Sequence, residues 1–387
     1  MEVLEGATTV ERSILDHARQ TKTPANGSIE ITPLCNMNCD MCYVRLSPEQ
    51  MAQQGRLRTG QEWLAVGCQM RDAGVLFLLI TGGEPLTHPD FKEIYLGMQQ
   101  LGMIVTVNTN GTLIDEQWAA FFAEHKPRRI NITLYGADAE AYHRLCHYPD
   151  GFERTLHAIQ LLKQQGVDVK VSSSLTRANQ ADWEKVIHIG EKLGVPVRED
   201  TYMCPATRER NMPYNQQSRM SPEEAGQVRI KLLRAEMGDE LFYQSAAFNL
   251  YRTANTPVGD GVPQPMKCMA GSCSFSINWQ GHMRPCVIST APEADVFSVG
   301  FTEAWNDIVA ETAKLHTSSQ CAKCTLRQFC NNCVMYSLYE CGRHDGVPDY
   351  ICRYTRASLR AMAEEYRAMT AEYQAAQEGV PGDDTTV

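Results

Sequence analysis

Three cysteines near the N-terminus are the side chains most able to do chemistry. Cys35, Cys39 and Cys42 lie in the stretch CNMNCDMCY, with the spacing C-x3-C-x2-C. Structural zinc sites and ordinary iron–sulfur sites take four protein ligands. Three thiolates on a four-iron cluster leave one iron open, and an open position distinguishes a catalytic metal from a structural one. A zinc site or three unrelated thiols would give the same spacing.

A glycine-rich turn follows the next apolar run of the chain. Residues 81–85 read TGGEP and come directly after LFLLI at 76–80. The two glycines allow a close approach of the backbone, and Glu84 can accept a hydrogen bond from an ammonium group. Alone, such a sequence is usually only a turn. The turn directly follows an apolar run, just as the cysteine stretch directly follows SIEITP at 28–33.

The elements that would position these residues alternate between strands and helices. Helical patterns occupy 116–125, 152–165 and 181–193, and Thr59 with Glu62 predicts a capping box at a further helix. β-branched runs lie between them, at 28–33, 76–80, 103–108, 129–134, 167–174 and 195–202. This alternation predicts an α/β fold with parallel strands. An open six-stranded barrel and a doubly wound sheet both fit, and in a barrel the site lies at the carboxyl ends of the strands.

The cysteine triad, the aromatic Tyr43 after it and the TGGEP turn together resemble the radical S-adenosylmethionine enzymes. The resemblance implies a partial (β/α)6 TIM-like barrel. It also implies that the open iron binds S-adenosylmethionine, which is cleaved to methionine and a 5′-deoxyadenosyl radical that abstracts a substrate hydrogen. Tyr135 in TLYG departs from the SLDG of many relatives. The cofactor-binding residues implied are Tyr43, Gly82, Gly83, Glu84, Asn108, Thr133 and Ser172.

The chain has 15 cysteines, an odd number, and no secretory signal. This favours metal binding over a disulfide framework. Nine of the cysteines lie between 268 and 352. Cys68, Cys146 and Cys204 stand apart, and we interpret them as ordinary core residues.

The later cysteines resemble the SPASM-type extension of radical enzymes, which carries two auxiliary 4Fe-4S clusters. The resemblance implies one quartet of Cys268, Cys273, Cys286 and Cys333, and a second of Cys321, Cys324, Cys330 and Cys352. The last pair of the pattern is separated by two residues where three are usual, and Cys341 could replace Cys352. A zinc ribbon is the alternative, although it would leave Cys268, Cys273 and Cys286 unexplained. With the catalytic cluster, three 4Fe-4S clusters are expected.

The length of 387 residues predicts more than one domain. Ser221, Pro222 and Glu224 predict the start of a helix after the barrel. The expected division is an N-terminal extension 1–27, the barrel 28–220, a helical bridge 221–265, a cysteine-rich iron–sulfur domain 266–353, and a C-terminal helix with a loose tail 354–387.

Composition excludes several classes of partner. The formal net charge is −10 and no basic run offsets it, so nucleic acid is a poor partner. No apolar run approaches the roughly 20 residues that span a bilayer. With no signal peptide either, the chain is expected to be cytoplasmic.

The resemblance further implies a peptide substrate, because SPASM-type enzymes act mainly on peptides and proteins. We expect oxidative crosslinking of a ribosomally made peptide, through a thioether or carbon–carbon bond, with a flavodoxin- or ferredoxin-type electron donor. Only 27 residues precede the first predicted strand, so we expect the leader to be bound by a separate leader-binding protein or by the barrel mouth itself. Alternatives are an anaerobic sulfatase-maturing enzyme, a radical enzyme acting on a small molecule, and a zinc-stabilised adaptor. Sulfatase maturation is disfavoured because Val287 follows Cys286 where those enzymes carry an Asp base.

Side chains near the sixth predicted strand are candidates for the base or for substrate contacts, although each is equally compatible with an ordinary loop position. These candidates are Glu199, Asp200, Tyr202, Cys204 and Arg208. The pair His143 and His147 shows no acidic partner pattern, and we interpret both as surface or packing residues.

Overall fold

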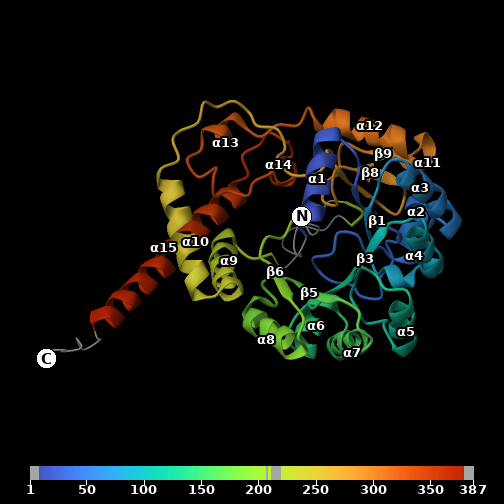
Figure 1. Ribbon diagram of the computed structural model, residues 1–387, viewed down its shortest axis with the longest axis horizontal. Helices are drawn as coiled ribbons and strands as arrows, with labels where there is room; N and C mark the ends of the chain where they lie inside the picture. The colour runs from blue at the N-terminus through green and yellow to red at the C-terminus, as the bar shows by residue number, and fades with distance from the viewer. Residues whose placement is uncertain (1–7, 206–207, 211–218, 379–387) are drawn as a thin grey trace. The chain divides into compact units, whose positions relative to one another are not determined.

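The computed structural model describes residues 8–205, 208–210 and 219–378 (Figure 1). They divide into two compact units. The first unit comprises the chain up to Arg219 together with Pro265–His316, and the second comprises Met220–Gln264 with the chain from Thr317 onward. The tail predicted to be loose lies largely in 379–387, outside the described residues.

A nine-stranded sheet forms the centre of the first unit, in the order β6-β5-β4-β3-β2-β1-β7-β8-β9. Strands β1 to β6 are parallel neighbours in sequence order, which confirms the predicted α/β fold typical of a partial TIM barrel. Their bounds are β1 Asn26–Glu30, β2 Phe77–Thr81, β3 Ile104–Thr109, β4 Arg129–Thr133, β5 Val169–Ser174 and β6 Val197–Asp200.

The first strand begins and ends earlier than the predicted 28–33. Asn26 already pairs with Phe77 of β2 and with Ser274 of β7, so the ladder starts there. Thr32 then turns the chain, because its hydroxyl accepts a hydrogen bond from the Leu34 amide at 3.0 Å. Pairing with neighbours, which local sequence does not reveal, therefore sets the strand ends.

Three strands of the sheet were not predicted. They are β7 Ser274–Ile277, β8 His282–Arg284 and β9 Ala294–Asp295. Strand β7 pairs parallel with β1, whereas β8 and β9 add antiparallel pairs. Strands this short give too few alternating positions to be recognised from sequence.

Helices surround this sheet. The predicted capping box at Thr59 and Glu62 is present at the start of α3. The helices are α1 Thr9–Thr21, α2 Pro48–Gln54, α3 Gly60–Asp72, α4 Phe91–Gln100, α5 Glu116–Glu124, α6 Ala139–Cys146, α7 Gly151–Gln164, α8 Trp183–Leu193, α11 Val296–Val299 and α12 Phe301–Thr312, with 3-10 turns η2 Pro85–Thr87 and η3 Gln180–Asp182.

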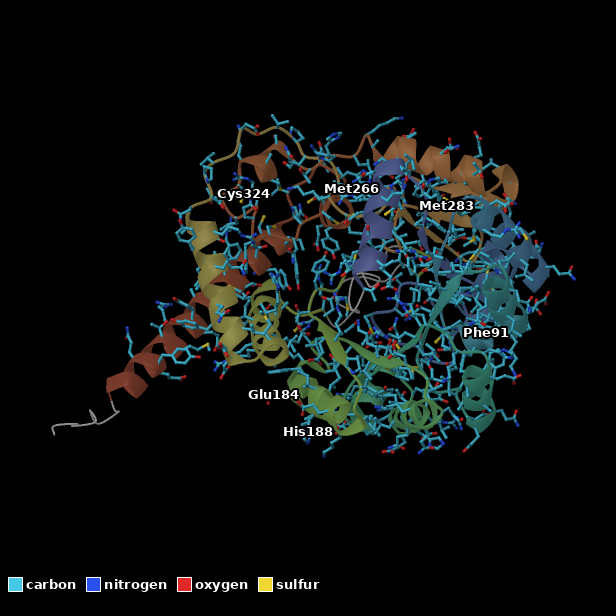
Figure 2. All side chains as sticks on the ribbon, in the orientation of Figure 1. Phe91, Glu184, His188, Met266, Met283 and Cys324 are labelled. Carbon is cyan, nitrogen blue, oxygen red and sulfur yellow. The ribbon has the colours of Figure 1, made fainter. Side chains whose placement is uncertain are left out.

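Aromatic rings join two of these helices beside the sheet. Phe91 and Tyr95 of α4 stack with centroids 5.8 Å apart, and Phe91 meets Trp118 of α5 edge-on at 5.5 Å (Figure 2). Phe122 is completely buried in the same cluster. Such contacts add about 0.5–1.5 kcal/mol per pair beyond burial, and they hold α4 and α5 firmly to the strands that they connect.

The second unit is helical. Helix α9 begins with the predicted capping box of Ser221 and Glu224. The C-terminal helix begins at Asp349, before the predicted boundary at 354. Its contacts with α9 are more extensive than those with any other helix. The helices are α9 Pro222–Met237, α10 Asp239–Ala254, α13 Ser319–Lys323, α14 Val334–Cys341 and α15 Asp349–Glu378. Within the described residues, no helix has both the length and the apolar character needed to cross a membrane.

Candidate active site

The cysteine triad occupies the loop after β1, at the carboxyl end of the strand. Backbone amides point at two of its sulfurs: the Met37 amide donates to Cys35 Sγ at 3.4 Å, and the Arg45 amide donates to Cys42 Sγ at 3.3 Å. Amide donors of this kind stabilise thiolates that ligate iron–sulfur clusters. These two amides thus favour the thiolate forms of Cys35 and Cys42.

The three thiols also lie within electrostatic range of one another. Burial, followed by the charges of Glu84, Cys42 and Cys39, raises the pKa of the Cys35 thiol well above its usual value. Burial and the neighbouring Cys39 likewise raise the pKa of Cys42. Buried thiols that repel each other as thiolates need a cation to hold them together, and a cluster of iron ions meets that need. The residues therefore fit a 4Fe-4S cluster.

The TGGEP turn packs against the start of this loop. The Gly83 amide donates to the Thr32 carbonyl at 2.7 Å, and the Glu84 amide donates to the Leu34 carbonyl at 2.8 Å. A Cβ on Gly82 would stand 2.4 Å from the Thr32 oxygen, and one on Gly83 would stand 2.4 Å from the Leu34 oxygen. Both glycines are thus required by the close contact between the two loops.

Glu84 is fully buried below the triad. Its carboxylate accepts hydrogen bonds from the Thr109 hydroxyl at 2.8 and 2.9 Å, from the Asn110 amide at 2.8 Å and from the Leu86 amide at 3.1 Å. Burial raises the pKa of Glu84 to about 7, although these donors oppose the rise. The side chain braces the turn after β3. Its role toward a cofactor ammonium stays a prediction.

Asn110 is a site residue that sequence reasoning missed. Its Nδ2 donates to Cys35 Sγ at 3.7 Å and to Asn36 Oδ1 at 2.9 Å. The predicted residue on this strand, Asn108, instead accepts from Asn131 of β4 at 2.8 Å. The sequence NTNG at 108–111 marks a turn after β3, but nothing in it singles out the side chain that reaches sulfur.

Thr133 and Ser172 are direct neighbours at the ends of β4 and β5, where they pair in register. Both are partly exposed, as expected of positions that face a cofactor. Tyr43, the third predicted contact, lies with its ring centroid 5.0 Å from the Arg208 guanidinium. These geometries are compatible with the predicted cofactor contacts, which stay predictions.

Arg208 is a buried, ion-paired residue and not the ordinary loop side chain that its sequence context suggested. Its side chain is 3% exposed and pairs with Glu30 and Glu209, whose side chains are 2% and 3% exposed. One nitrogen also donates to the Val287 carbonyl at 2.5 Å. Coulombic attraction to Glu30 raises the pKa of Arg208, whereas burial opposes this shift. The ion pairs connect the end of β1 with the segment after Cys286.

The end of helix α6 supports the other side of the cysteine loop. The Asn38 amide donates to the Cys146 carbonyl at 3.1 Å, and the Asp40 amide donates to the Leu145 carbonyl at 3.0 Å. His147 Nε2 lies 2.7 Å from Asp40 Oδ1. The local sequence around His143 and His147 did not show this acidic partner, because Asp40 stands 107 residues away.

The remaining predicted mouth residues lie in or beyond β6. Glu199 is buried, and Asp200 accepts from the Tyr202 amide at 3.0 Å. The Tyr202 ring lies 5.3 Å from the Arg219 guanidinium, and Cys204 is half-buried.

The predicted auxiliary cysteines occur in both units. In the first unit Cys268 is exposed, Cys273 is buried and Cys286 is half-buried. Cys333 belongs to the second unit, where its Sγ accepts from the Tyr336 amide at 3.4 Å.

Four thiols gather in the second unit. Burial, followed by the neighbouring Cys352, Cys330 and Cys324 thiols, raises the pKa of Cys321 to about 11. Cys324, labelled in Figure 2, also receives a hydrogen bond from the Leu326 amide at 3.4 Å. Cys341 is exposed, and the charged groups facing it are Glu340 and Arg343 rather than other thiols. The geometry thus favours Cys352 over Cys341 as the companion of the other three.

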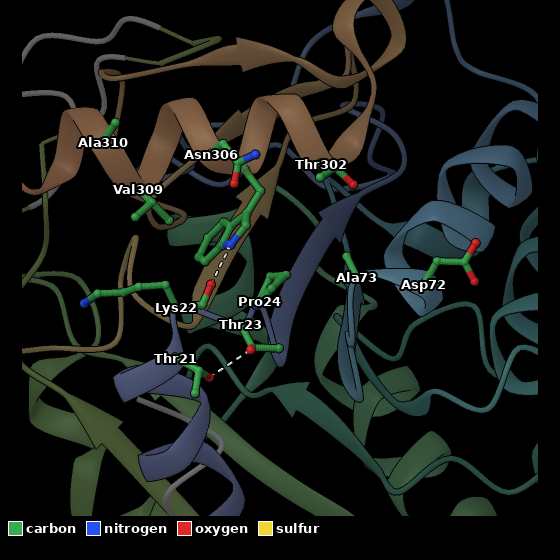
Figure 3. A pocket seen from close by; sticks show the side chains of 11 residues that line it. Thr21, Lys22, Thr23, Pro24, Asp72, Ala73, Thr302, Asn306, Val309 and Ala310 are labelled. Atoms are coloured by element: carbon green, nitrogen blue, oxygen red, sulfur yellow. Dashed lines mark hydrogen bonds between the residues drawn. The ribbon is translucent and has the colours of Figure 1, made fainter.

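One surface pocket lies at the opposite ends of the strands. Lys22 and Thr23 line it just before β1, Asp72 lines it before β2, and Trp305 of α12 donates to the Lys22 carbonyl (Figure 3). It is therefore separate from the cysteine loop. In residues 8–205, 208–210 and 219–378, no three His, Cys, Asp or Glu side chains are arranged to share a single metal ion. In a 4Fe-4S cluster each thiolate instead binds a different iron.

Two curated proteins are informative relatives. An AdoMet-dependent heme synthase of Methanosarcina barkeri is 27% identical over 49% of this chain and 53% of that protein, so the chain matches about half of it. The antilisterial bacteriocin subtilosin biosynthesis protein AlbA of Bacillus subtilis is 22% identical over 81% of this chain and 68% of that protein.

Two solved structures share the fold. SuiB of Streptococcus suis, bound to its precursor peptide SuiA, matches with a TM-score of 0.64 and 15% identity, over 89% of this chain and 80% of that chain. The structure of anSMEcpe with bound AdoMet matches with a TM-score of 0.62 and 16% identity, over 90% of this chain and 99% of that chain. Residues 29–189 match the Radical SAM superfamily. This part of the chain is thus a radical SAM domain.

Proposed function

We propose that this radical SAM enzyme matures a ribosomally made peptide by oxidative crosslinking, through a thioether or carbon–carbon bond. The observation that carries the proposal is the group of four thiols in the second unit, Cys321, Cys324, Cys330 and Cys352. Four protein ligands leave no open iron, so a cluster held there suits electron transfer rather than substrate binding.

The cysteine loop after β1 is the proposed catalytic centre. Cys35, Cys39 and Cys42 would hold a 4Fe-4S cluster, which when bound supplies the electron that cleaves S-adenosylmethionine. Asn110 supports this centre by donating to Cys35. The proposed cofactor contacts are Tyr43, Gly82, Gly83, Glu84, Asn108, Thr133 and Ser172.

The electron balance of crosslinking explains the need for further clusters. Forming one new bond removes two hydrogen atoms from the peptide. One is taken by the 5′-deoxyadenosyl radical, and the other leaves as a proton and an electron. The proposed acceptors are the second-unit quartet and the further auxiliary cluster that the SPASM-type resemblance implies, which gives three clusters in all. A flavodoxin- or ferredoxin-type protein would supply the first electron.

The comparisons support a peptide substrate. SuiB, which shares the fold, was solved with a precursor peptide, and AlbA is named for bacteriocin biosynthesis. We propose that a separate protein binds the leader of the precursor.

A small-molecule substrate is the second candidate, favoured by the similarity to a heme synthase. Sulfatase maturation is less favoured, because Val287 follows Cys286 and cannot act as a base. The Arg208 guanidinium donates a hydrogen bond to the Val287 backbone carbonyl. The Val287 side chain itself is apolar.

The test is an anaerobic assay of the reconstituted enzyme with small peptides encoded beside it. We expect formation of 5′-deoxyadenosine together with a loss of two hydrogen atoms from a peptide. A parallel reaction with a precursor porphyrin tests the second candidate. Formation of 5′-deoxyadenosine without any change in peptide mass would contradict the proposed function.

A further inference from the structure

A closed ring of hydrogen bonds lies beside the first cysteine of the triad. Asn110 Nδ2, from the turn after β3, donates to Asn36 Oδ1 at 2.9 Å, and Asn36 Nδ2 donates to the Thr112 hydroxyl at 2.8 Å. The Thr112 hydroxyl completes the ring by donating to Asn110 Oδ1 at 2.7 Å. Asn110 Nδ2 also donates to the Cys35 sulfur at 3.7 Å. The ring therefore holds a side-chain donor against one sulfur of the triad.

A backbone group fixes which way the Asn110 side chain faces. The Thr112 backbone amide donates to Asn110 Oδ1 at 2.9 Å, and a backbone N–H can only donate. The side-chain oxygen consequently faces Thr112, and the nitrogen faces Cys35. That nitrogen carries two hydrogens, so it can donate to the Cys35 sulfur and to Asn36 at the same time.

The backbone of Asn110 is held on both sides as well. Its amide donates to the Glu84 carboxylate at 2.8 Å, and its carbonyl accepts from the Thr155 hydroxyl at 3.1 Å. Asn110, Glu84, Thr112 and Thr155 are all buried. Contacts of both the backbone and the side chain thus restrain the donor, which has little freedom to turn away from Cys35.

The loaded site leaves the direction of this hydrogen bond in no doubt. A cysteine that ligates iron has lost its proton, so the Cys35 sulfur can only accept. The Asn110 side chain is a neutral amide and keeps its N–H groups. The reduced cluster carries one more negative charge than the oxidised cluster, so an N–H donor stabilises the reduced form more. A buried setting strengthens the effect.

We propose that Asn110 is a positioning residue that raises the reduction potential of the catalytic cluster by donating to its Cys35 ligand. Hydrogen bonds to the sulfur ligands are among the determinants of such potentials. The Thr112 hydroxyl contributes through the ring, because hydrogen bonds in a chain polarise one another. The inference rests on the proposed cluster of the triad but not on the identity of the substrate.

The test is a redox titration of the reconstituted enzyme, monitored by the electron paramagnetic resonance of the reduced cluster. A variant with alanine in place of the three triad cysteines supplies the auxiliary-cluster spectrum for subtraction. We expect a more negative midpoint in Asn110→Leu, which keeps a side chain of similar size without a donor. Thr112→Val keeps the Asn110 amide and removes only the hydroxyl of the ring, so its midpoint should shift less, in the same direction.

Asn306→Ala is the matched control. It changes an exposed asparagine of α12 that lines the separate pocket at the opposite ends of the strands, and its midpoint should match that of the wild type (Figure 3).

Equal midpoints in the wild type and Asn110→Leu, at equal iron content, would overturn the inference. If Asn110→Leu binds less iron, Thr112→Val decides the question: a more negative midpoint supports the inference, and a midpoint equal to that of the wild type overturns it. If the wild type has no signal beyond that of the triad variant, the proposed catalytic cluster fails together with the inference. Unchanged midpoints with an intact cluster overturn the inference alone and leave the proposed function untouched.

Discussion

The cysteine loop of the first unit and the thiol quartet of the second differ in their surroundings. In the loop, Cys39 is 6% exposed, and Asn110 Nδ2, from the turn after β3, donates to the Cys35 sulfur at 3.7 Å. In the quartet, Cys324 is exposed and its companions are half-buried. Two side chains donate to sulfurs there, the Thr355 hydroxyl to Cys330 at 3.4 Å and Asn332 Nδ2 to Cys321 at 3.9 Å.

The difference follows from where each group of thiols is built. Parallel strands bring their carboxyl ends to one edge of the sheet. The turns after β2, β3 and β4 therefore lie near the cysteine loop, which follows β1. The quartet instead comes from short segments around α13 and the start of α15, which pack against helices. The proposed roles agree with this difference, because a buried group of three thiols suits guarded chemistry and a more exposed group of four suits electron exchange.

Removing the first group should have the largest effect. The Cys35→Ala/Cys39→Ala/Cys42→Ala variant is expected to hold about 8 iron per chain, against about 12 in the wild type, and to form no 5′-deoxyadenosine. Iron and sulfide analysis after anaerobic reconstitution, with product analysis, measures both. Bound zinc with little iron in the wild type would identify a structural metal protein instead.

Removing the quartet should spare the cleavage of S-adenosylmethionine. A variant with alanine at Cys321, Cys324, Cys330 and Cys352 is also expected to lose about 4 of about 12 iron. It should still form 5′-deoxyadenosine but no crosslinked peptide. Cys341→Ala is the matched control and should retain all iron. Loss of iron in Cys341→Ala but not in Cys352→Ala would reverse the assignment of the last ligand.

The braced surroundings of the first site should be sensitive to single hydrogen bonds. Thr109→Val removes the hydroxyl that donates to buried Glu84. We expect it to lower the free energy of unfolding by about 1.5–3 kcal/mol, because it removes a hydrogen bond to a buried carboxylate, which then keeps only the Asn110 and Leu86 amides. Urea unfolding of the iron-free protein measures this loss. Thr21→Val changes an exposed hydroxyl and should stay within about 0.5 kcal/mol of the wild type.

Loss of one hydrogen bond at the quartet should lower the free energy of unfolding by less. Thr355→Val removes a donor 3.4 Å from the half-buried Cys330 sulfur. The expected loss is about 0.5–1.5 kcal/mol, because one neutral hydrogen bond is removed and no charged group is stranded. The same urea series measures it. A loss larger than that of Thr109→Val would refute the contrast between the two sites.

Sequence alone determined the features that depend on near neighbours. The spacing of Cys35, Cys39 and Cys42, the TGGEP turn and the capping box at Thr59 all act over a few residues, and the structure places each at the end or start of the expected element. The six parallel strands were equally visible, because alternation of strands and helices is itself a local pattern.

Tertiary structure decided which side chains meet. Asn110 reaches Cys35 across 75 positions, and Arg208 reaches Glu30 across 178. The Asn38 amide meets the Cys146 carbonyl only because α6 ends beside the cysteine loop. Strands β7 to β9 likewise depend on pairing with a distant strand. Such contacts follow from the order and register of the strands, which no local pattern specifies, so the cysteine loop could be located from sequence but the side chains that surround it could not.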